Sequence, residues 1–372
     1  MKRVIISVTS DLVTDQRVHR TASSLHNAGL TVILAGRQLK KSLPLAERTY
    51  KTVRFKLWFE KGALFYACYN IRLFFFLLFN KADVLVANDL DTLLPNYLAS
   101  KLKGAELYYD SHEYFTEVPE LVNRKGIQKT WKMIERFVFP KLKHVYTVND
   151  AIATLYEKEY KVNVDVVRNI PAAFSKQIVP MTRKELGLPE NKKIILYQGA
   201  GINIHRGAEE ALEAMLYLKD VVLLFIGSGD VIEQLKDMRD VLNLADKVLF
   251  VPKLPMEELR QYTQVADIGL TLDKNTNINY RFSLPNKLFD YIHAGLPVLA
   301  SPLVEVKKII DQYQIGNTIE DHNPKHIAAK INDMFSDEKR FAQWKENLKL
   351  AAQELCWEKE EKQLLKIFKD VI

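Results

Sequence analysis

The chain has only two cysteines, Cys68 and Cys356, among its 372 residues. So few cysteines exclude a disulfide framework and a cysteine-built zinc site. The sequence also shows no repeat period and no low-complexity tract, which excludes a repeat protein. Hydrophobic residues at 48% and charged residues at 27% are typical of a soluble globular protein, and the length predicts two domains.

The sequence also lacks an apolar run of the length that a membrane-spanning helix normally needs. The first apolar segment ends at Asp11, which is too early for the core of a signal peptide and indicates a buried strand. The strongest run, residues 63–79, falls short of about 20 residues and contains Asn70 and Arg72. Two interpretations remain open: a buried helix between two strands, or a helix at a membrane interface with Arg72 reaching the headgroups.

The formal charge of +7 is distributed unevenly along the chain. Residues 1–180 hold 27 lysines and arginines against 17 acidic side chains, whereas residues 181–372 hold 26 against 29. Within residues 123–144, basic side chains recur at helical spacing at Lys125, Lys129, Lys132 and Arg136. This segment is either a solvated basic face or a contact for anionic lipid headgroups. No nucleic-acid motif accompanies the charge, so an anionic acceptor or a membrane surface is the expected partner.

Short β-rich runs alternate with helical patterns in both halves of the chain. This alternation predicts βαβ units and parallel sheets, and therefore two doubly wound α/β domains. The expected strands are residues 4–9, 31–35, 53–58, 84–87, 106–109, 145–148 and 164–167, then 194–198, 221–226, 248–251, 268–272 and 298–300. Three prolines in residues 169–192 mark the connection, and the last 30 residues are expected to be helical throughout. We predict domains at 1–172 and 173–350, followed by a terminal helix at 351–372.

The loop after residues 194–198 reads GAGINIHRGAEEAL and has features of an anion site. Gly199 and Gly201 allow backbone amides to approach a ligand closely. A helix is expected to begin near Gly207, directly after Arg206, whose guanidinium matches phosphate. The glycine-rich dinucleotide and P-loop motifs are both incomplete here, and the dinucleotide pattern also fails in the loop at Gly227.

The segment 280–300, YRFSLPNKLFDYIHAGLPVLA, is the most informative. Pro285 is expected to open a helix, with Ser283 as its cap. Asn286 and Lys287 then lie in the first turn, and Asp290 shares their face. Because a lysine at a helix amino terminus opposes the helix dipole, it indicates an anion bound there, and Asp290 can accept two hydroxyl hydrogen bonds from a ribose.

The motif SLPNKLFDYIHAGLPVLAS resembles the donor-site signature of family-4 glycosyltransferases, also called group 1, which have the GT-B fold. Further segments are similar in order and spacing: DQRVHRTASSLHNAGLTV, YDSHEYFTE, YQGAGINIHRGAEEALEAM, VADIGLTL and ELCWEKEEKQLLKIF. The resemblance implies two Rossmann-like domains facing a central cleft. It also implies that the terminal helix returns to the amino-terminal domain.

The resemblance assigns roles to residues at matching positions. Asp290 would hold the ribose of a nucleotide sugar, Arg206 and Lys287 would neutralise its diphosphate, and His112 would contact the transferred sugar. The other implied donor-binding residues are Gly199, Ala200, Gly201, Gly227, Lys253, Leu254, Pro285 and Asn286. No metal and no other cofactor is expected, since cations and helix-end amides would stabilise the departing diphosphate.

The function that the resemblance implies is retaining, metal-independent transfer of a hexose-type sugar to a glycan or lipid-linked acceptor. Cell-surface polysaccharide or glycolipid synthesis would be its setting, in the cytoplasm or at the inner face of the membrane. One departure stands out, because Phe282 occupies the position of the family's first motif glutamate. A catalytically silent nucleotide-sugar-binding scaffold and a nonhydrolysing nucleotide-sugar epimerase therefore remain alternatives.

Asp89-Leu90-Asp91 has the spacing of a metal-binding Asp-x-Asp motif. It follows an expected strand of the amino-terminal domain, away from the expected donor site. We interpret it as a loop and helix cap that leads into Thr92, with a role on the acceptor side as the alternative.

Overall fold

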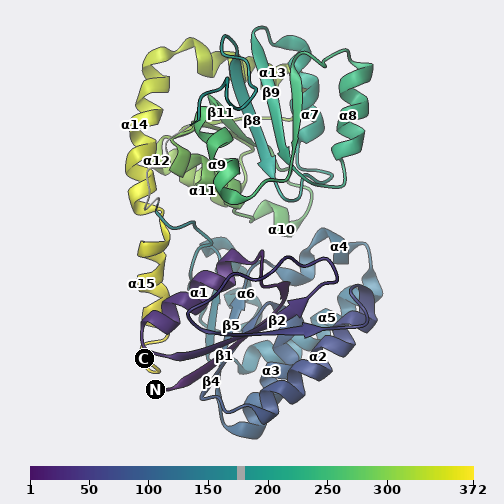
Figure 1. Ribbon diagram of the computed structural model, residues 1–372, viewed down its shortest axis with the longest axis vertical. Helices are drawn as coiled ribbons and strands as arrows, with labels where there is room; N and C mark the ends of the chain where they lie inside the picture. Colours follow the sequence, from purple (N-terminus) through teal and green to yellow (C-terminus); the bar gives the residue numbers. More distant parts are fainter. Residues whose placement is uncertain (174–180) are drawn as a thin grey trace. The chain divides into compact units, whose positions relative to one another are not determined.

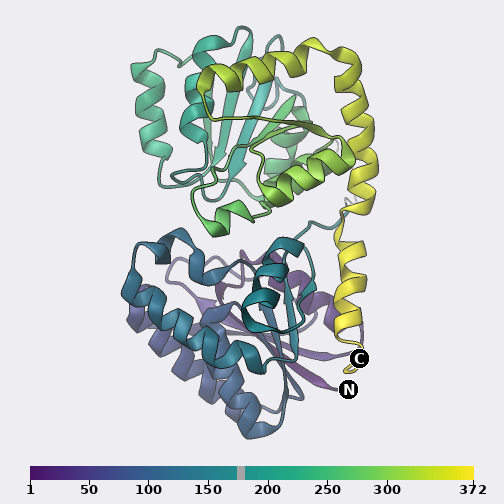
Figure 2. The same ribbon diagram turned by 180° about the vertical axis from the view of Figure 1, so that it is seen from behind.

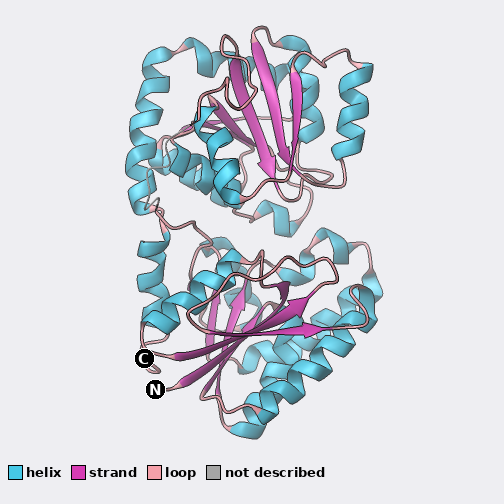
Figure 3. Ribbon diagram, viewed as in Figure 1, coloured by secondary structure: helices cyan, strands magenta, loops and turns pink. Residues whose placement is uncertain are grey.

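The protein is described from a computed structural model, which covers residues 1–173 and 181–372 (Figure 1). It consists of two compact units. The amino-terminal unit contains Met1–Asn169 and Lys359–Ile372, and the carboxyl-terminal unit contains Ile170–Glu358. Helices flank a sheet in each unit (Figure 3).

The amino-terminal unit is built on a seven-stranded parallel sheet of order β3-β2-β1-β4-β5-β6-β7. Its strands are β1 Arg3–Asp11, β2 Thr31–Gln38, β3 Lys51–Lys56, β4 Val84–Asn88, β5 Glu106–Ser111, β6 His144–Thr147 and β7 Asp165–Val166. Its helices are α1 Gln16–Asn27, α2 Gly62–Phe79, α3 Leu90–Lys103, α4 Pro119–Val122, α5 Lys125–Val138, α6 Asp150–Tyr160 and α15 Trp357–Ile367, with 3₁₀ turns at Phe115–Glu117 and Phe139–Lys141. The strand order reverses direction at β1 and β4, as in doubly wound sheets.

The carboxyl-terminal unit contains a six-stranded parallel sheet of order β10-β9-β8-β11-β12-β13. Its strands are β8 Lys193–Gly199, β9 Val221–Gly227, β10 Val248–Pro252, β11 Ile268–Thr271, β12 Val298–Ala300 and β13 Gly316–Thr318. Its helices are α7 Ala208–Ala214, α8 Ile232–Val241, α9 Met256–Val265, α10 Ile278–Arg281, α11 Asn286–Ala294, α12 Val304–Tyr313, α13 Pro324–Ser336 and α14 Glu338–Glu354, with a 3₁₀ turn at Met215–Tyr217.

Side chains along β8 alternate between the two faces of the sheet, as the pleat requires. Ile195 and Tyr197 join an apolar cluster with α7 and α13, whereas Ile194 and Leu196 join a second cluster with α11 and α12. Both faces of this central strand are therefore buried, which explains its continuous apolar sequence.

Local sequence signals fix several helix ends. Asp15 and Asn149 precede α1 and α6, and their side chains accept hydrogen bonds from Val18 N and Ile152 N. Gly104 ends α3 in the left-handed region at φ 71°, where a glycine is favoured. These caps satisfy backbone groups that would otherwise be left without partners at the helix ends.

The structure confirms the expected alternation, and all twelve predicted strands are present within three residues of their expected ends. The prediction missed β13, which is short and pairs with β12. A Cβ atom on Gly316 would lie 1.9 Å from Val298 O, so the close pairing of these strands requires a glycine.

The observed unit boundaries differ from the expected ones. The amino-terminal unit ends at Asn169 instead of residue 172, and its returning segment begins at Lys359 instead of residue 351. The expectation that the last 30 residues form continuous helix is wrong, because Leu355 and Cys356 separate α14 from α15. There the amide of Trp357 donates to Pro171 O at 3.0 Å.

Helix α15 packs within the amino-terminal unit (Figure 2). The carboxylate of Glu360 accepts two hydrogen bonds from the Arg168 guanidinium, at 2.8 and 2.5 Å. The Phe368 ring stacks on Tyr108 with centroids 4.3 Å apart. Residues 359–372 therefore complete the amino-terminal unit, and the expectation that the terminal helix returns there agrees with these contacts.

Candidate functional site

The carboxyl ends of β8, β9 and β10 meet at one edge of the six-stranded sheet. Gly199 pairs with Gly227, and Gly227 pairs with Pro252. The loops that follow therefore share this edge, where open α/β sheets bind ligands. These loops contain the expected donor-binding residues Gly199, Ala200, Gly201, Gly227, Lys253 and Leu254. The Lys253 side chain is exposed, and Leu254 packs against the apolar core.

The loops after β8 and β9 are joined by backbone hydrogen bonds. Ser228 N donates to Gly199 O at 3.2 Å, and Ile202 N donates to Ser228 O at 2.9 Å. A Cβ atom on Gly227, whose φ is 141°, would lie 1.8 Å from Gly199 O, and one on Gly229 would lie 2.0 Å from Ile202 O. Glycines at 227 and 229 are thus required by chain packing.

Gly199 and Gly201 differ from this pair, since a Cβ atom on either would meet its nearest neighbour at 3.7 or 3.6 Å. These are ordinary contacts, so packing within the chain does not require glycine at either position. The sequence argument that these two glycines leave space for a ligand is compatible with this geometry.

Arg206 lies between this edge and the loop after β11. Its Nη1 donates to the carboxylate of Asp273 at 3.0 Å, and its guanidinium lies 4.7 Å from the centroid of the Tyr280 ring. The hydroxyl of Tyr197 donates to Arg206 O. Burial opposes the charge of Arg206, but the adjacent Asp273 carboxylate raises its pKa above the ordinary value. The guanidinium is therefore a fixed, permanently charged group.

Lys287 reaches the same carboxylate from α11. Its Nζ lies 3.7 Å from Asp273 Oδ2 and 4.3 Å from the centroid of the Tyr197 ring, and its side chain is only 9% exposed. Burial lowers the pKa of Lys287, and Asp273 acts in the opposite direction. The structure thus brings together two of the predicted cationic residues, 81 positions apart in the chain, on one buried carboxylate.

The start of α11 agrees with the sequence prediction in position but not in its cap. Helix α11 begins at Asn286, whose side chain is exposed, and Pro285 occupies the position before it. The predicted capping role of Ser283 is wrong, because its hydroxyl donates to Tyr280 O at 2.9 Å. Ser283 therefore closes the turn after α10 and leaves the first amides of α11 without a side-chain cap.

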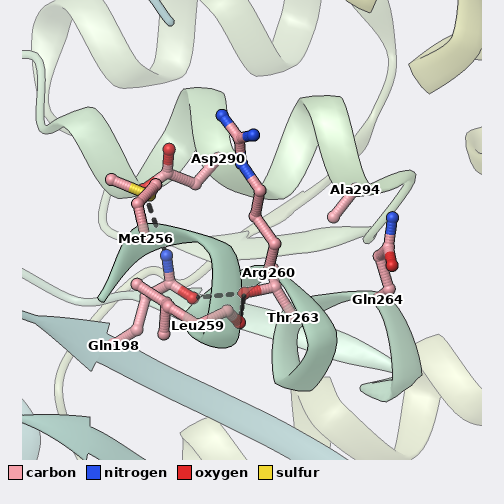
Figure 4. A pocket seen from close by; sticks show the side chains of 8 residues that line it. All are labelled: Gln198, Met256, Leu259, Arg260, Thr263, Gln264, Asp290 and Ala294. Carbon is pink, nitrogen blue, oxygen red and sulfur yellow. Dashed lines mark hydrogen bonds between the residues drawn. The ribbon is translucent and has the colours of Figure 1, made fainter. Parts of the chain in front are cut away.

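Asp290 lies one turn further along α11, beside a small pocket between α9 and α11 (Figure 4). Its carboxylate accepts a hydrogen bond from Gln198 Nε2 at 3.1 Å. Gln198 is 1% exposed, and its Oε1 accepts from the Thr263 hydroxyl at 2.8 Å. The orientation of the Gln198 amide is thereby fixed, and with it one oxygen of Asp290. The pocket is lined by Gln198, Met256, Leu259, Arg260, Thr263, Gln264, Asp290 and Ala294.

His112 belongs to a second polar cluster, in the amino-terminal unit after β5. Its Nδ1 lies 3.2 Å from Asp89 and its Nε2 lies 3.3 Å from Asp110, while its backbone amide donates to Asp89 Oδ1 at 2.8 Å. Asp110 is fully buried and also accepts two hydrogen bonds from Arg17, at 3.1 and 2.6 Å. Burial by itself opposes protonation, but the two carboxylates raise the pKa of His112 to about 9. At neutral pH the imidazole is therefore a cation.

This shift gives the stability of the protein a specific pH dependence. The pKa of about 9 in the folded state exceeds the ordinary 6.5, so charged His112 stabilises the fold fully below about pH 6.5. The contribution declines as the pH rises toward 9. We expect the difference in unfolding free energy between wild type and His112→Asn to shrink by roughly 3 kcal/mol between about pH 6 and about pH 9.5. Urea unfolding at both pH values measures it, and a constant difference would contradict the assignment.

The two carboxylates of Asp89-Leu90-Asp91 contact different groups. Asp89 faces His112, whereas Asp91 accepts a hydrogen bond from the Thr9 hydroxyl at 2.6 Å. Burial, together with the charge of Asp89, raises the pKa of Asp91 to about 7. Asp89 occupies the position before α3 as expected, but the predicted cap is wrong because its side chain makes no capping hydrogen bond. Its φ of 58° is unusual outside glycine.

Sequence reasoning missed Asp273 and Gln198 in the carboxyl-terminal unit, and Asp110 with its partner Arg17 beside His112. Asp273 directly follows the expected strand 268–272, so a polar residue at the end of an expected strand was an available signal. Gln198 lies within a buried strand and Asp110 within β5, and a polar residue in an apolar run is again the signal. The side chains of other elements that Asp273, Gln198 and Asp110 contact could not be identified without the fold, because each of these partners is distant in the sequence.

Solved structures identify the class of this fold. The chain is similar to sucrose-phosphate synthase from Thermosynechococcus elongatus, with a TM-score of 0.82 and 15% identity over 100% of this chain and 99% of that chain. It is also similar to WaaG, a glycosyltransferase involved in lipopolysaccharide biosynthesis, with a TM-score of 0.74 and 17% identity over 98% and 99% of the two chains. The predicted GT-B fold of two parallel-sheet α/β domains is thus confirmed.

The family follows from the sequence of the carboxyl-terminal unit. Residues 179–351 match the family described as glycosyl transferases group 1. An uncharacterized glycosyltransferase of Methanocaldococcus jannaschii is 25% identical over 158 residues, and a putative colanic acid biosynthesis glycosyl transferase of Escherichia coli K12 is 32% identical over 119. These matches cover 42% and 32% of this chain but only 39% and 28% of the relatives' lengths.

Proposed function

We propose that this chain is a retaining, metal-independent glycosyltransferase that moves a hexose-type sugar from a nucleotide-diphosphate sugar to a glycan or lipid-linked acceptor. The proposal includes a cytoplasmic setting in polysaccharide or glycolipid synthesis. The observation that carries it is the convergence of Arg206 and Lys287 on Asp273, inside the segment that matches the group 1 family.

The chemistry of sugar transfer fits this arrangement of charges. Breaking the bond between sugar and diphosphate develops negative charge on the departing diphosphate. Two cations that are already fixed, Lys287 buried and Arg206 half-buried, stabilise such charge without reorganisation during the reaction. Asp273 leaves the pair with a net positive charge while holding both groups in place. In the proposed mechanism, the acceptor hydroxyl attacks on the face of the leaving group, and the diphosphate takes up its proton.

A structural neighbour supports the choice of substrate. Anabaena HepE, described in complex with UDP and with UDP-glucose, shares the fold at a TM-score of 0.74 and 13% identity over 100% of both chains. In this chain, the Asp290 carboxylate beside the α9–α11 pocket is the proposed partner of the ribose hydroxyls. Gly199, Ala200 and Gly201 lie at the same edge of the sheet, as a bound diphosphate requires.

Gln198 is then a positioning residue for the ribose contact. Replacing its amide in Gln198→Met removes the hydrogen bond to Asp290 but keeps an unbranched side chain of similar length. We expect the KM for the nucleotide sugar to rise about tenfold with little change in kcat, because one charge-assisted hydrogen bond to a binding group is lost. Steady-state kinetics check this, with Thr263→Ser as the matched control that keeps the hydroxyl. An equal fall in kcat with unchanged KM would contradict the positioning role.

Phe282 favours a second candidate, a nucleotide-sugar-binding protein without turnover. Its half-buried ring stands where the family's first motif glutamate is expected, and the Arg281 guanidinium lies 5.4 Å from its centroid. In the proposed enzyme, Asn286 and Lys287 take over contacts that this glutamate would make.

One experiment separates the two functions. Thermal denaturation with UDP-, GDP- and ADP-sugars identifies the base, because a bound ligand raises the melting temperature. Release of nucleoside diphosphate with lipid extracts as acceptors then tests turnover. Stabilisation with release supports the enzyme, and stabilisation without release supports the silent binder. If no common nucleotide sugar raises the melting temperature or yields nucleoside diphosphate, both proposals fail.

A further inference from the structure

Helices α2, α3 and α5 lie side by side on one face of the seven-stranded sheet (Figures 1 and 2). The inner side of α2 packs into the core through Phe65, Tyr69, Leu73 and Leu77. Aromatic contacts join the layer: the Tyr66 and Trp131 centroids are 5.3 Å apart, and those of Tyr97 and Phe137 are 5.9 Å apart. The three helices therefore form one continuous layer with a common outer side, which we call the α2–α3–α5 face.

The α2–α3–α5 face is unusually apolar. Its exposed large apolar side chains are Leu64, Ile71, Phe75 and Phe79 on α2, Leu98 and Leu102 on α3, and Ile127, Met133 and Phe137 on α5. Ile71 is 60% exposed, Phe75 50% and Phe79 78%. On a helix, residues 64, 71 and 75 project in nearly the same direction. Exposed apolar side chains gathered on one layer of helices mark a surface that another apolar phase covers.

The exposed charge on the three helices themselves has one sign. Within α2, α3 and α5, all of which the structure describes, no exposed side chain is acidic, since Asp91 and Glu135 are buried. The exposed cations are Arg72, Lys101, Lys125, Lys129 and Arg136. Lys141 lies 3.5 Å from the centroid of the Phe137 ring, and it lines a groove at this edge together with Lys101, Lys143 and the carboxylate residue Glu106. At Phe137, a cation thus lies against an exposed aromatic ring of this face.

Helix α2 was expected to be too short to cross a membrane, but it is the one helix, among the residues that the structure describes, that reaches the length and hydropathy for crossing. Crossing would remove its buried residues Phe65, Tyr69, Leu73 and Leu77 from the core of the amino-terminal unit. A position in the interface avoids this, because only the outer side would enter the lipid. Exposed apolar groups bordered by lysines match acyl chains below anionic headgroups.

We propose that the α2–α3–α5 face docks on an anionic lipid bilayer, with Ile71, Phe75 and Phe79 in the acyl region and Lys129 and Arg136 at the headgroups. This inference goes beyond the proposed function and stands independently of it, since it concerns a surface of the amino-terminal unit alone. In this proposal, both interpretations of residues 63–79 apply to the same helix, since one side of α2 is buried in the core and the other side lies at the membrane interface.

The test is sedimentation of the full chain with vesicles. We expect binding to equimolar phosphatidylcholine and phosphatidylglycerol, and much weaker binding to phosphatidylcholine alone. Ile71→Ser with Phe75→Ser should weaken binding at least about tenfold, because two large apolar groups no longer enter the lipid. Lys129→Glu with Arg136→Glu should abolish the preference for anionic vesicles.

Matched controls come from exposed residues of the carboxyl-terminal unit. Leu350→Ser on α14 and Lys349→Glu beside it change comparably exposed side chains and should leave vesicle binding unchanged. Circular dichroism confirms that each variant is folded. The proposal is overturned if the wild type fails to bind anionic vesicles or if the face variants bind like the controls. It is also overturned if the Ile71 and Phe75 changes convert a dimer to a monomer, since the face would then bind a second copy of the chain.

Discussion

Lys287→Ala is expected to lower turnover of the nucleotide sugar by about 10²–10³-fold. The ammonium group is buried, fixed by Asp273 at 3.7 Å and packed over the Tyr197 ring, so no mobile surface cation can take its place. The loss should fall mainly on kcat, because the negative charge on the diphosphate grows as the sugar departs. Release of nucleoside diphosphate under saturating donor measures the effect.

The fold should tolerate this change. Asp273 keeps its 3.0 Å hydrogen bond from Arg206, so the substitution does not leave a buried carboxylate without a partner. Lys307→Ala on α12 is the control, since Lys307 forms an exposed pair with Asp311 and a surface pair contributes little. Lys287→Arg should recover part of the activity. Wild-type turnover in Lys287→Ala would remove this lysine from the proposed mechanism.

Asp110→Ala is expected to lower the free energy of unfolding of the amino-terminal unit by about 3–5 kcal/mol. Asp110 is completely buried and accepts two hydrogen bonds from Arg17, which is itself only 4% exposed. Removing the carboxylate leaves the buried guanidinium with the carbonyl of Val167 as its remaining partner, at 2.9 Å. An uncompensated buried charge is far more costly than a lost surface contact.

Urea unfolding measures this loss, and a double variant shows its cause. Asp110→Leu combined with Arg17→Met removes both charges and should be less destabilised than Asp110→Ala. Asp311→Ala, on the exposed surface of the carboxyl-terminal unit, serves as the control. An unchanged unfolding midpoint in Asp110→Ala would show that the Arg17–Asp110 pair does not stabilise the unit.

The sequence predicted elements better than it predicted partners. Alternating and continuous apolar runs are local signals, which is why twelve strands were found within three residues of their ends. The sequence pattern did not predict β13, because two of its three residues, Gly316 and Asn317, are weak strand formers and depend on pairing with β12. Likewise, the Ser283 hydroxyl could either cap α11 or donate to Tyr280 O. The fold of the preceding turn determines that it donates to Tyr280 O.

In the candidate site, too, local motifs were predicted from the sequence but contacts between distant residues were not. Arg206, Lys287 and Asp290 could be proposed from a motif, because each stands at a fixed distance from a glycine or proline that is near in the sequence. Asp273 and Gln198 could not, since their significance depends on which side chains approach them from other elements. Their buried positions beside charged groups are a property of three-dimensional packing.

The hydrogen bonds between the loops after β8 and β9 have a further consequence for recognition. Gly199, Ile202 and Ser228 are joined to each other by backbone hydrogen bonds within the chain itself. Ordering a free loop costs about 1–2 kcal/mol of conformational entropy per residue, and a loop already ordered does not incur this cost on binding. Affinity for a nucleotide sugar would then depend little on loop closure at this edge, and association there should need no slow rearrangement of the glycine loops.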